Sequence, residues 1–424
     1  MKIAVIGTGI AGNVAAYHLS REHEVTVYEA NDYIGGHTHT HDIEWQGTQF
    51  TVDSGFIVFN RETYPNFIKL LDELGVTARP SVMSFGVKCD RTGLEYSGGS
   101  LNELFAQRRN LLRPGFYRMV GDILRFFRES RQLLEVWDES LTLGQYLQRN
   151  RYSDEFINQY IIPMGAAIWS TDPKQMFDFP ACYFVNFFKN HGLLGVTEQL
   201  QWYVINGGSR AYVEKLVAPF KDRIRLRSPV LSVRRFPSLV QVTSADGGIE
   251  FYDHVFIASH SNQALGMLAD PSMLEREILG AIPYQRNEAV LHTDQSVLPK
   301  SRRAWASWNY HILDGEDHRV ALTYNMNILQ GIPTRDQFCV TLNNSDAIDP
   351  DKVIKRMVYD HPVFTSEGVA AQARQHEING VNRTYFVGAY WRHGFHEDGV
   401  VSALNALDHF QERAYAQQPL RRAG

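Results

Sequence analysis

Lys2-Ile3-Ala4-Val5-Ile6-Gly7-Thr8-Gly9-Ile10-Ala11-Gly12, at the start of the chain, decides the fold that we expect. Its apolar half is short enough for one buried strand of a parallel sheet, and residues 14–19 have a helical composition. A second apolar run, Val25 to Tyr28, ends at Glu29. A strand, a GxGxxG turn, a helix, a strand and an acid in this order are typical of a dinucleotide-binding βαβ unit.

Each glycine of this turn has a distinct structural role in such a unit. Gly7 permits the tight turn, Gly9 lets the backbone approach a pyrophosphate, and Gly12 lets the helix pack closely on the strand. The helix N-terminus offers unpaired N–H groups to the phosphates. Glu29 stands where an acid accepts hydrogen bonds from an adenosine ribose. An ordinary glycine-rich turn is the alternative, but the whole ordered pattern favours a dinucleotide.

The bulk composition indicates a globular protein of two or three lobes. The chain has 424 residues, of which 44% are hydrophobic and 21% charged, and its net charge of -5 gives no reason to expect nucleic acid. Cys89, Cys182 and Cys339 form no CxxC pair, so we expect no disulfide framework or zinc cluster. The first strand begins at residue 2 and no apolar run reaches about 20 residues, which favours a cytoplasmic location.

A second glycine pair, Gly35-Gly36, distinguishes between cofactors. Nicotinamide enzymes normally continue from the ribose acid into another βα unit, whereas a second glycine turn suits a cofactor whose flavin half runs back across the domain. Here the sequence resembles the flavin enzymes that include monoamine oxidases, protoporphyrinogen oxidases and phytoene desaturases. In those enzymes an arginine follows the glycine pair, and His37 stands at that position here. The resemblance implies FAD, which we expect to be non-covalent because no attachment motif is present.

Three histidines alternate after the glycine pair. His37, His39 and His41 would share one face of an extended segment, which suggests a metal site at first sight. No carboxylate or cysteine partner stands beside them, and we therefore expect no metal.

The resemblance spans nearly the whole chain and implies further cofactor contacts. Residues 53–56 resemble an Asp-x-Gly segment whose backbone passes close to the flavin, and Val230 matches a residue that contacts the adenine side. Residues 384–404 resemble the last cofactor motif, in which N–H groups at Gly399 to Val401 would stabilise negative charge on reduced flavin. The cofactor-binding residues that we predict are Gly7, Gly9, Ala11, Gly12, Glu29, Gly35, Gly36, His37, Gly55, Phe56, Val230, Gly388, Gly399 and Val400.

We predict an α/β fold with three parts. Residues 1–75, 205–266 and 380–424 are expected to form a Rossmann-type FAD-binding domain. Residues 76–100 and 267–379 are expected to form an antiparallel sheet that walls a substrate cavity or is purely structural. Strand-like runs at 81–88 and 94–96, and alternation between apolar and polar side chains within 284–343, including 320–328, predict it. Residues 101–204 carry long helical patterns and predict a helical lobe.

Two features of the predicted helical lobe, an arginine face and a cluster of aromatic residues, each allow a structural and a functional interpretation. A wheel over residues 114–131 places Arg118, Arg125 and Arg128 opposite an apolar face. An ordinary surface helix and a basic face for anionic lipid both fit, so a peripheral membrane contact stays open. The aromatic residues between 179 and 188 are typical of a core, but they also suit an apolar substrate tunnel.

The resemblance implies hydride transfer from a substrate carbon to the flavin. The aromatic lobe favours an apolar or lipid substrate, fatty acyl or isoprenoid, and so a desaturase or a double-bond isomerase. An amine oxidase and a non-catalytic flavoprotein are the alternatives. In the loop before the last helix, Phe395 or His396 should face the reacting carbon. His396 can act as acid or base, unless it only satisfies backbone groups.

Overall fold

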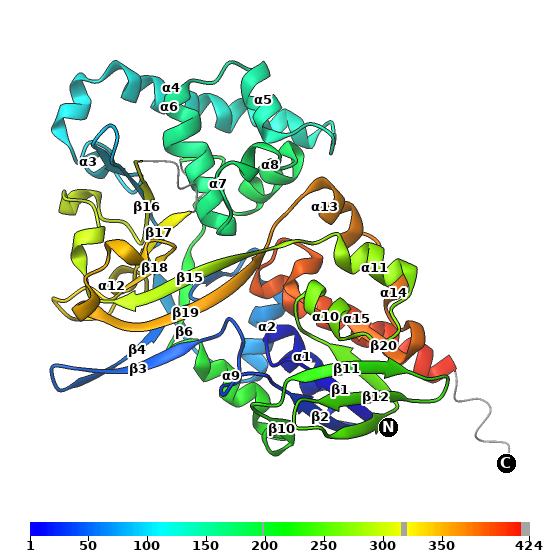
Figure 1. Ribbon diagram of the computed structural model, residues 1–424. Helices are drawn as coiled ribbons and strands as arrows, with labels where there is room; N and C mark the ends of the chain where they lie inside the picture. The colour runs from blue at the N-terminus through cyan, green and yellow to red at the C-terminus, as the bar shows by residue number, and fades with distance from the viewer. Residues whose placement is uncertain (197–198, 315–319, 417–424) are drawn as a thin grey trace, which may run out of the picture.

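The computed structural model describes residues 1–196, 199–314 and 320–416. Figure 1 shows a mixed α/β part around the N-terminus, a long-stranded sheet above it, and a lobe of helices on the far side of that sheet. This architecture confirms the predicted fold class. The predicted domain ranges also cover residues 197–198, 315–319 and 417–424, which lie outside the described residues.

A five-stranded parallel sheet forms the base of the molecule. Its strand order is β10-β2-β1-β14-β20, so the first strand of the chain lies in the middle. Because both faces of a parallel sheet are covered, Ile3, Ala4 and Val5 of β1 have no exposed surface. The sheet consists of β1 (Lys2–Ile6), β2 (Glu24–Tyr28), β10 (Ile224–Arg225), β14 (His254–Ile257) and β20 (Thr384–Phe386).

Helices and small sheets complete this base. The helix α1 (Ile10–Leu19) packs against the last helix, α15 (His396–Ala416). The remaining helices here are α2 (Pro65–Glu73), α9 (Arg210–Val217), α10 (Ser261–Met267), α11 (Met273–Gly280), α13 (Ser366–Gln372) and α14 (Gln375–Ile378). The small sheets are β3 (Thr40–Trp45) with β4 (Thr48–Asp53); β5 (Phe59–Asn60), β9 (Trp202–Ile205) and β6 (Ala78–Ser81); and β11 (Val230–Arg235), β12 (Val240–Ser244) and β13 (Ile249–Tyr252).

The second large sheet has seven strands in the order β19-β15-β18-β17-β16-β7-β8. Its neighbours are antiparallel as predicted, except for β16 and β7, which pair in parallel. The exception arises because the helical lobe separates these two strands in sequence, so no hairpin fixes their direction. The strands are β7 (Phe85–Cys89), β8 (Leu94–Ser97), β15 (Tyr284–His292), β16 (Trp308–Ile312), β17 (Ala321–Asn325), β18 (Cys339–Leu342) and β19 (Val353–Pro362).

One predicted strand in this sheet is too long. The alternating pattern over residues 320–328 suggests a continuous strand, but β17 ends at Asn325. The Asn325 side chain accepts a hydrogen bond from the Ile328 N–H and so caps a short helix, α12 (Met326–Leu329). A capping side chain therefore overrides the strand pattern.

The helical lobe is built on a compact aromatic core. Phe126, Phe156, Phe184 and Phe188 are completely buried, so most of the aromatic residues in this segment are packing residues. The lobe contains α3 (Leu101–Leu104), α4 (Pro114–Glu129), α5 (Leu143–Arg149), α6 (Asp154–Phe156), α7 (Ile162–Trp169) and α8 (Ala181–Asn190). Within the described residues, every helix is too short or too polar to cross a membrane.

Candidate flavin site

One large cavity lies where the parallel sheet, the second sheet and the helical lobe meet. Its volume is about 730 Å³, which is within the usual range for small-molecule sites. All but three of the predicted cofactor-binding residues line it. They are Gly7, Gly9, Ala11, Glu29, Gly35, Gly36, His37, Gly55, Phe56, Val230 and Gly388.

The glycine turn has the shape that a dinucleotide needs. A Cβ on Gly12 would lie 2.0 Å from the Gly7 carbonyl oxygen, so only glycine allows α1 to approach the turn; Gly12 serves this packing and does not line the cavity. Gly9 has no neighbouring atom within 4 Å of its Cβ direction, which leaves space for a ligand. A Cβ on Gly36 would lie 3.1 Å from the Gly9 Cα, so the two glycine turns lie against each other and form one cradle.

Glu29 is held rigidly at one end of this cradle. The carboxylate is buried, and it accepts four hydrogen bonds. The donors are the Thr8 N–H at 2.9 Å, the Thr8 hydroxyl, the Asn31 N–H at 2.8 Å and the Asn31 side-chain amide at 2.9 Å. An ionised carboxylate has about four acceptor positions, so these four bonds fill them and orient Glu29, and a ribose hydroxyl would take the place of one of the present donors.

His37 presents an unpartnered nitrogen to the cavity. Its Nε2 is buried and has no hydrogen-bond partner among the described residues. Its ring centroid is 5.4 Å from that of His361 and 6.1 Å from that of His260. Burial and mutual repulsion lower the pKa of His37 and of His260 to about 4, and that of His361 to about 3. No described residue that lines the cavity is a lysine or an arginine. An anionic diphosphate fits this wall because the buried His37 ring has a nitrogen that can donate a hydrogen bond and has no protein acceptor for it among the described residues.

The last helix begins earlier than predicted. It starts at His396, and the Gly399 N–H already donates to the Phe395 carbonyl. Gly399 and Val400 do not line the cavity, and a Cβ on Gly399 would lie 2.7 Å from Ile10 of α1. The expectation that N–H groups at Gly399 to Val401 face the cofactor is therefore wrong for Gly399. The unpaired N–H groups of the first turn of α15 belong to the residues that precede Gly399.

The two predicted catalytic residues both line the cavity, but their surroundings differ. Phe395 stacks on Phe187 of the helical lobe, with ring centroids 5.2 Å apart. His396 stacks on Phe56, and its Nε2 hydrogen-bonds to the Tyr212 hydroxyl at 2.7 Å and the Thr38 hydroxyl at 3.1 Å. Burial lowers the pKa of His396 well below its usual value, so its ring is neutral. These contacts fit an anchoring role, and a catalytic role for His396 stays a prediction.

A further part of the cavity wall is aromatic or aliphatic and comes from other elements of the fold. No local spacing marks these side chains, and the sequence predicted only the general aromatic character of the lobe. The wall includes Tyr64, Ile168, Trp169, Trp202, Trp308, Tyr324, Leu342 and Phe364.

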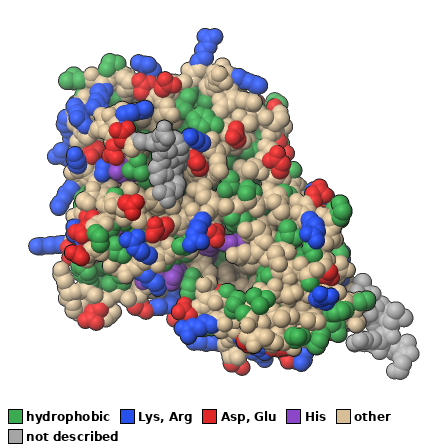
Figure 2. Space-filling model, viewed as in Figure 1, with side chains coloured by type: hydrophobic (Ala, Val, Ile, Leu, Met, Phe, Trp, Pro, Cys, Tyr) green, Lys and Arg blue, Asp and Glu red, His purple; other side chains and the backbone are tan. Residues whose placement is uncertain are grey.

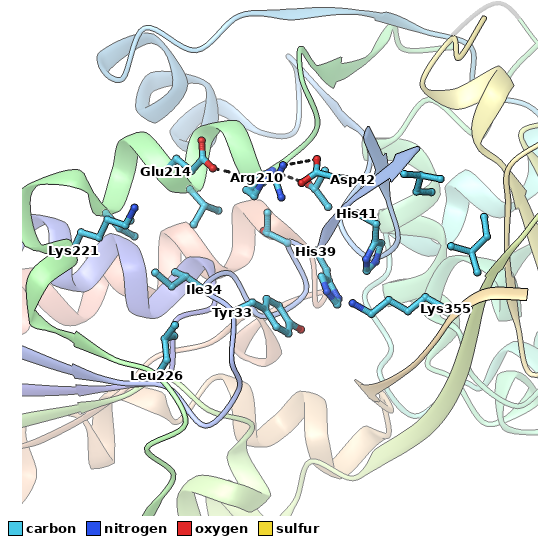
Figure 3. Close-up of a pocket in the computed structure, with 16 residues that line it drawn as sticks. Tyr33, Ile34, His39, His41, Asp42, Arg210, Glu214, Lys221, Leu226 and Lys355 are labelled. Carbon is cyan, nitrogen blue, oxygen red and sulfur yellow. Dashed lines mark hydrogen bonds and ion pairs between the residues drawn. The ribbon is translucent and has the colours of Figure 1, made fainter. Parts of the chain in front are cut away.

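The three alternating histidines do not share one face. The Thr38 N–H donates to the Gly35 carbonyl in a turn, and strand β3 begins only at Thr40, so the two-residue alternation does not reach back to His37. His39 and His41 line a second cavity of about 540 Å³. Figure 3 shows them beside Lys355, with Arg210 between Asp42 and Glu214. Within the described residues, no three potential ligands are grouped to hold a metal.

The chain belongs to the flavin containing amine oxidoreductase family, which it matches over residues 10–301. The protein is accordingly an FAD-dependent oxidoreductase. It is 37% identical over 128 residues to tryptophan 2-monooxygenase from Allorhizobium ampelinum, a match that covers 30% of this chain and only 17% of that relative.

Solved structures of the same fold cover the whole molecule. A fatty acid isomerase from P. acnes superposes with a TM-score of 0.69 at 15% identity, covering 96% of this chain and 98% of that one. Cyclohexylamine oxidase from Brevibacterium oxydans gives a TM-score of 0.69 at 16% identity, and the match covers 98% of this chain and 99% of that one. Such low identities establish the fold and leave the substrate open.

Proposed function

We propose that the protein removes hydride from a carbon of an apolar substrate, fatty acyl or isoprenoid, as a desaturase or a double-bond isomerase. The observation that carries this proposal is the aromatic and aliphatic wall described above. Among the described residues that line the cavity, the only carboxylates are Glu29, at the ribose end, and Asp360 of β19, and no lysine or arginine is present. An uncharged chain loses least on entering such a wall.

When bound, FAD supplies the acceptor for the hydride. The side chains of this protein bind the substrate, orient it and exclude water. Trp169, Trp308 and Tyr324 come from α7, β16 and β17, so the wall is fixed by three packed elements. His393 also lines the cavity and has a buried Nδ1 without a partner among the described residues. Burial lowers the pKa of His393 to about 3, so its ring stays neutral and its free nitrogen can hydrogen-bond to a bound substrate.

An amine oxidase is the second candidate. The family match and the likeness to cyclohexylamine oxidase favour it. The same aromatic wall accommodates a neutral amine as well as an alkyl chain. Membership of an oxidoreductase family counts against a non-catalytic flavoprotein.

Anaerobic flavin bleaching tests the proposal. For a desaturase, we expect a total lipid extract to bleach the flavin and a panel of primary and secondary amines to leave it yellow. An isomerase returns the hydride to its substrate, so its flavin stays yellow and the recovered lipid carries a shifted double bond. Mass spectrometry of the recovered lipid separates a desaturase, which removes two hydrogens, from an isomerase, which leaves the mass unchanged. Trp169→Ala should slow the reaction, whereas Trp137→Ala is the control because Trp137 is half exposed and outside the cavity. Bleaching by amines alone would establish the second candidate.

A further inference from the structure

We propose that one surface of the helical lobe docks the protein onto an anionic membrane. This surface, which we call the lobe surface, surrounds α3 and the start of α4. It consists of Leu101, Leu111, Leu112 and Tyr117 together with Arg108, Arg109 and Arg113. The inference goes beyond the flavin chemistry and does not depend on which substrate is oxidised.

The apolar half of the lobe surface is unusually exposed. Leu112 is 87% exposed and Leu101 77%, while Leu111 and Tyr117 are about half exposed, at 46% and 50%. A single exposed leucine needs no explanation, but four large apolar side chains within seventeen residues of sequence do. These side chains have no protein core to enter.

Hydrogen bonds and ring contacts hold this segment together as one surface. The Tyr117 hydroxyl donates to the Leu111 carbonyl at 3.1 Å, and the Tyr117 ring lies 6.0 Å from that of Phe105. The Arg108 guanidinium donates to the Phe105 carbonyl at 3.0 Å and to the Asn102 side chain at 2.5 Å. Residues 101–105, 108, 111 and 117 therefore lie side by side.

The arginines of the lobe surface have no acidic partner among the described residues. Arg108, Arg109 and Arg113 donate only to backbone carbonyls and side-chain amides, and none pairs with a carboxylate among the described residues. Figure 2 shows Lys and Arg side chains gathered along the edge of the lobe that carries α3 in Figure 1. Three uncompensated cations beside protruding leucines provide both interactions that interfacial membrane binding needs.

The arginines predicted from the helical wheel are different. Arg118 lies 3.8 Å from Glu155, Arg125 lies 3.1 Å from Asp122, and Arg128 lies 3.0 Å from Glu129. Their charges are compensated by acids, so we place lipid contact on the lobe surface and not on this face of α4. An acidic protein partner would use the same arginines but would not require leucines exposed to this degree.

Vesicle co-sedimentation of the full chain, saturated with FAD and without substrate, tests the inference. We expect binding to phosphatidylcholine vesicles that contain phosphatidylserine, and little binding to phosphatidylcholine alone. Arg108→Gln, Arg109→Gln and Arg113→Gln should each weaken binding about fivefold, and added salt should do the same. Leu111→Ser with Leu112→Ser should weaken it by roughly tenfold or more. Arg118→Gln with Arg128→Gln is the matched control and should leave binding unchanged.

These substitutions are all at exposed or half-exposed positions, so retained FAD absorbance and far-UV circular dichroism would show that each variant is folded. Absence of binding to anionic vesicles overturns the proposal and points to an acidic protein partner instead. Equal binding to neutral and anionic vesicles, or loss of binding in the Arg118/Arg128 control, also overturns it. None of these outcomes bears on the lipid-oxidation proposal, because no turnover is measured.

Discussion

FAD affinity should rise as the pH falls, and His37 should be the reason. The wall that faces the diphosphate carries no arginine or lysine among the described residues, so His37 is the nearest source of positive charge. A unit charge about 4 Å from an anion gains about 4 kcal/mol at an effective dielectric constant of about 20, which corresponds to roughly three pKa units. Bound FAD should thus raise the pKa of His37 from about 4 to near neutrality.

The sign follows from proton linkage. A group whose pKa is higher in the complex than in the apoprotein takes up a proton on binding, so affinity increases as pH drops. With a bound pKa of roughly 7, the Kd of FAD should tighten about tenfold between about pH 8 and about pH 6. Fluorescence quenching of FAD by the apoprotein measures this Kd, and circular dichroism confirms that the apoprotein stays folded over the range.

Two variants separate His37 from its neighbours. His37→Arg should bind FAD tightly at every pH, and His37→Gln should bind it weakly with no pH dependence. His260, His361 and Tyr359 also face His37. Burial raises the pKa of Tyr359, which stays neutral over this range, so a full pH slope in His37→Gln would assign the effect to one of the two histidines. A wild-type Kd that stays constant, or weakens as pH falls, would refute the reasoning.

Other expected outcomes concern the cofactor, acid stability and His396. Glu29→Ala should weaken FAD binding by about 1–3 kcal/mol, measured by the same quenching, because a buried hydrogen bond to the ribose is lost. Nine described histidines have a pKa lowered to about 3 or 4, so the unfolded chain takes up more protons and Tm should fall as the pH drops from about 6.5 to about 4. Asp53 and Asp398, whose pKa burial raises to about 6, oppose this trend but are outnumbered. His396→Phe removes one of the two partners that lie 2.7 Å from the Tyr212 hydroxyl and should lower stability by about 1–3 kcal/mol. Flavin reduction slowed ~100-fold in that variant would establish a catalytic role, and unchanged reduction would leave only the anchoring role.

Contiguous motifs were predicted well because their geometry is local. Gly7, the cradle glycines Gly9 and Gly36, and the acid Glu29 all stand within the first thirty-six residues, and each lines the large cavity, while their contact with a cofactor stays a prediction. A tight turn and a close helix contact depend on the residue types at fixed spacing, so the chain itself specifies them.

Predictions failed where a neighbouring hydrogen bond changed the local conformation. The turn closed by Thr38 N–H to the Gly35 carbonyl takes His37 out of the strand that contains His41. The Asp398 carboxylate accepts the Phe395 N–H at 2.9 Å at the start of α15, which therefore begins before Gly399. Residue spacing alone does not reveal where a turn ends or a helix begins.

The sequence by itself determined that this chain folds around FAD, because strand, glycines, helix and acid act over a few residues. Only the tertiary structure decided which distant side chains line the large cavity. Trp169 of α7 meets Trp308 and Tyr324 in one cavity, although α7 is far in sequence from the neighbouring strands β16 and β17 that pair these two residues. His260, at the N-cap of α10, and His361 of β19 likewise join His37. Such contacts depend on how two sheets and a helical lobe pack together, and no local pattern encodes that packing.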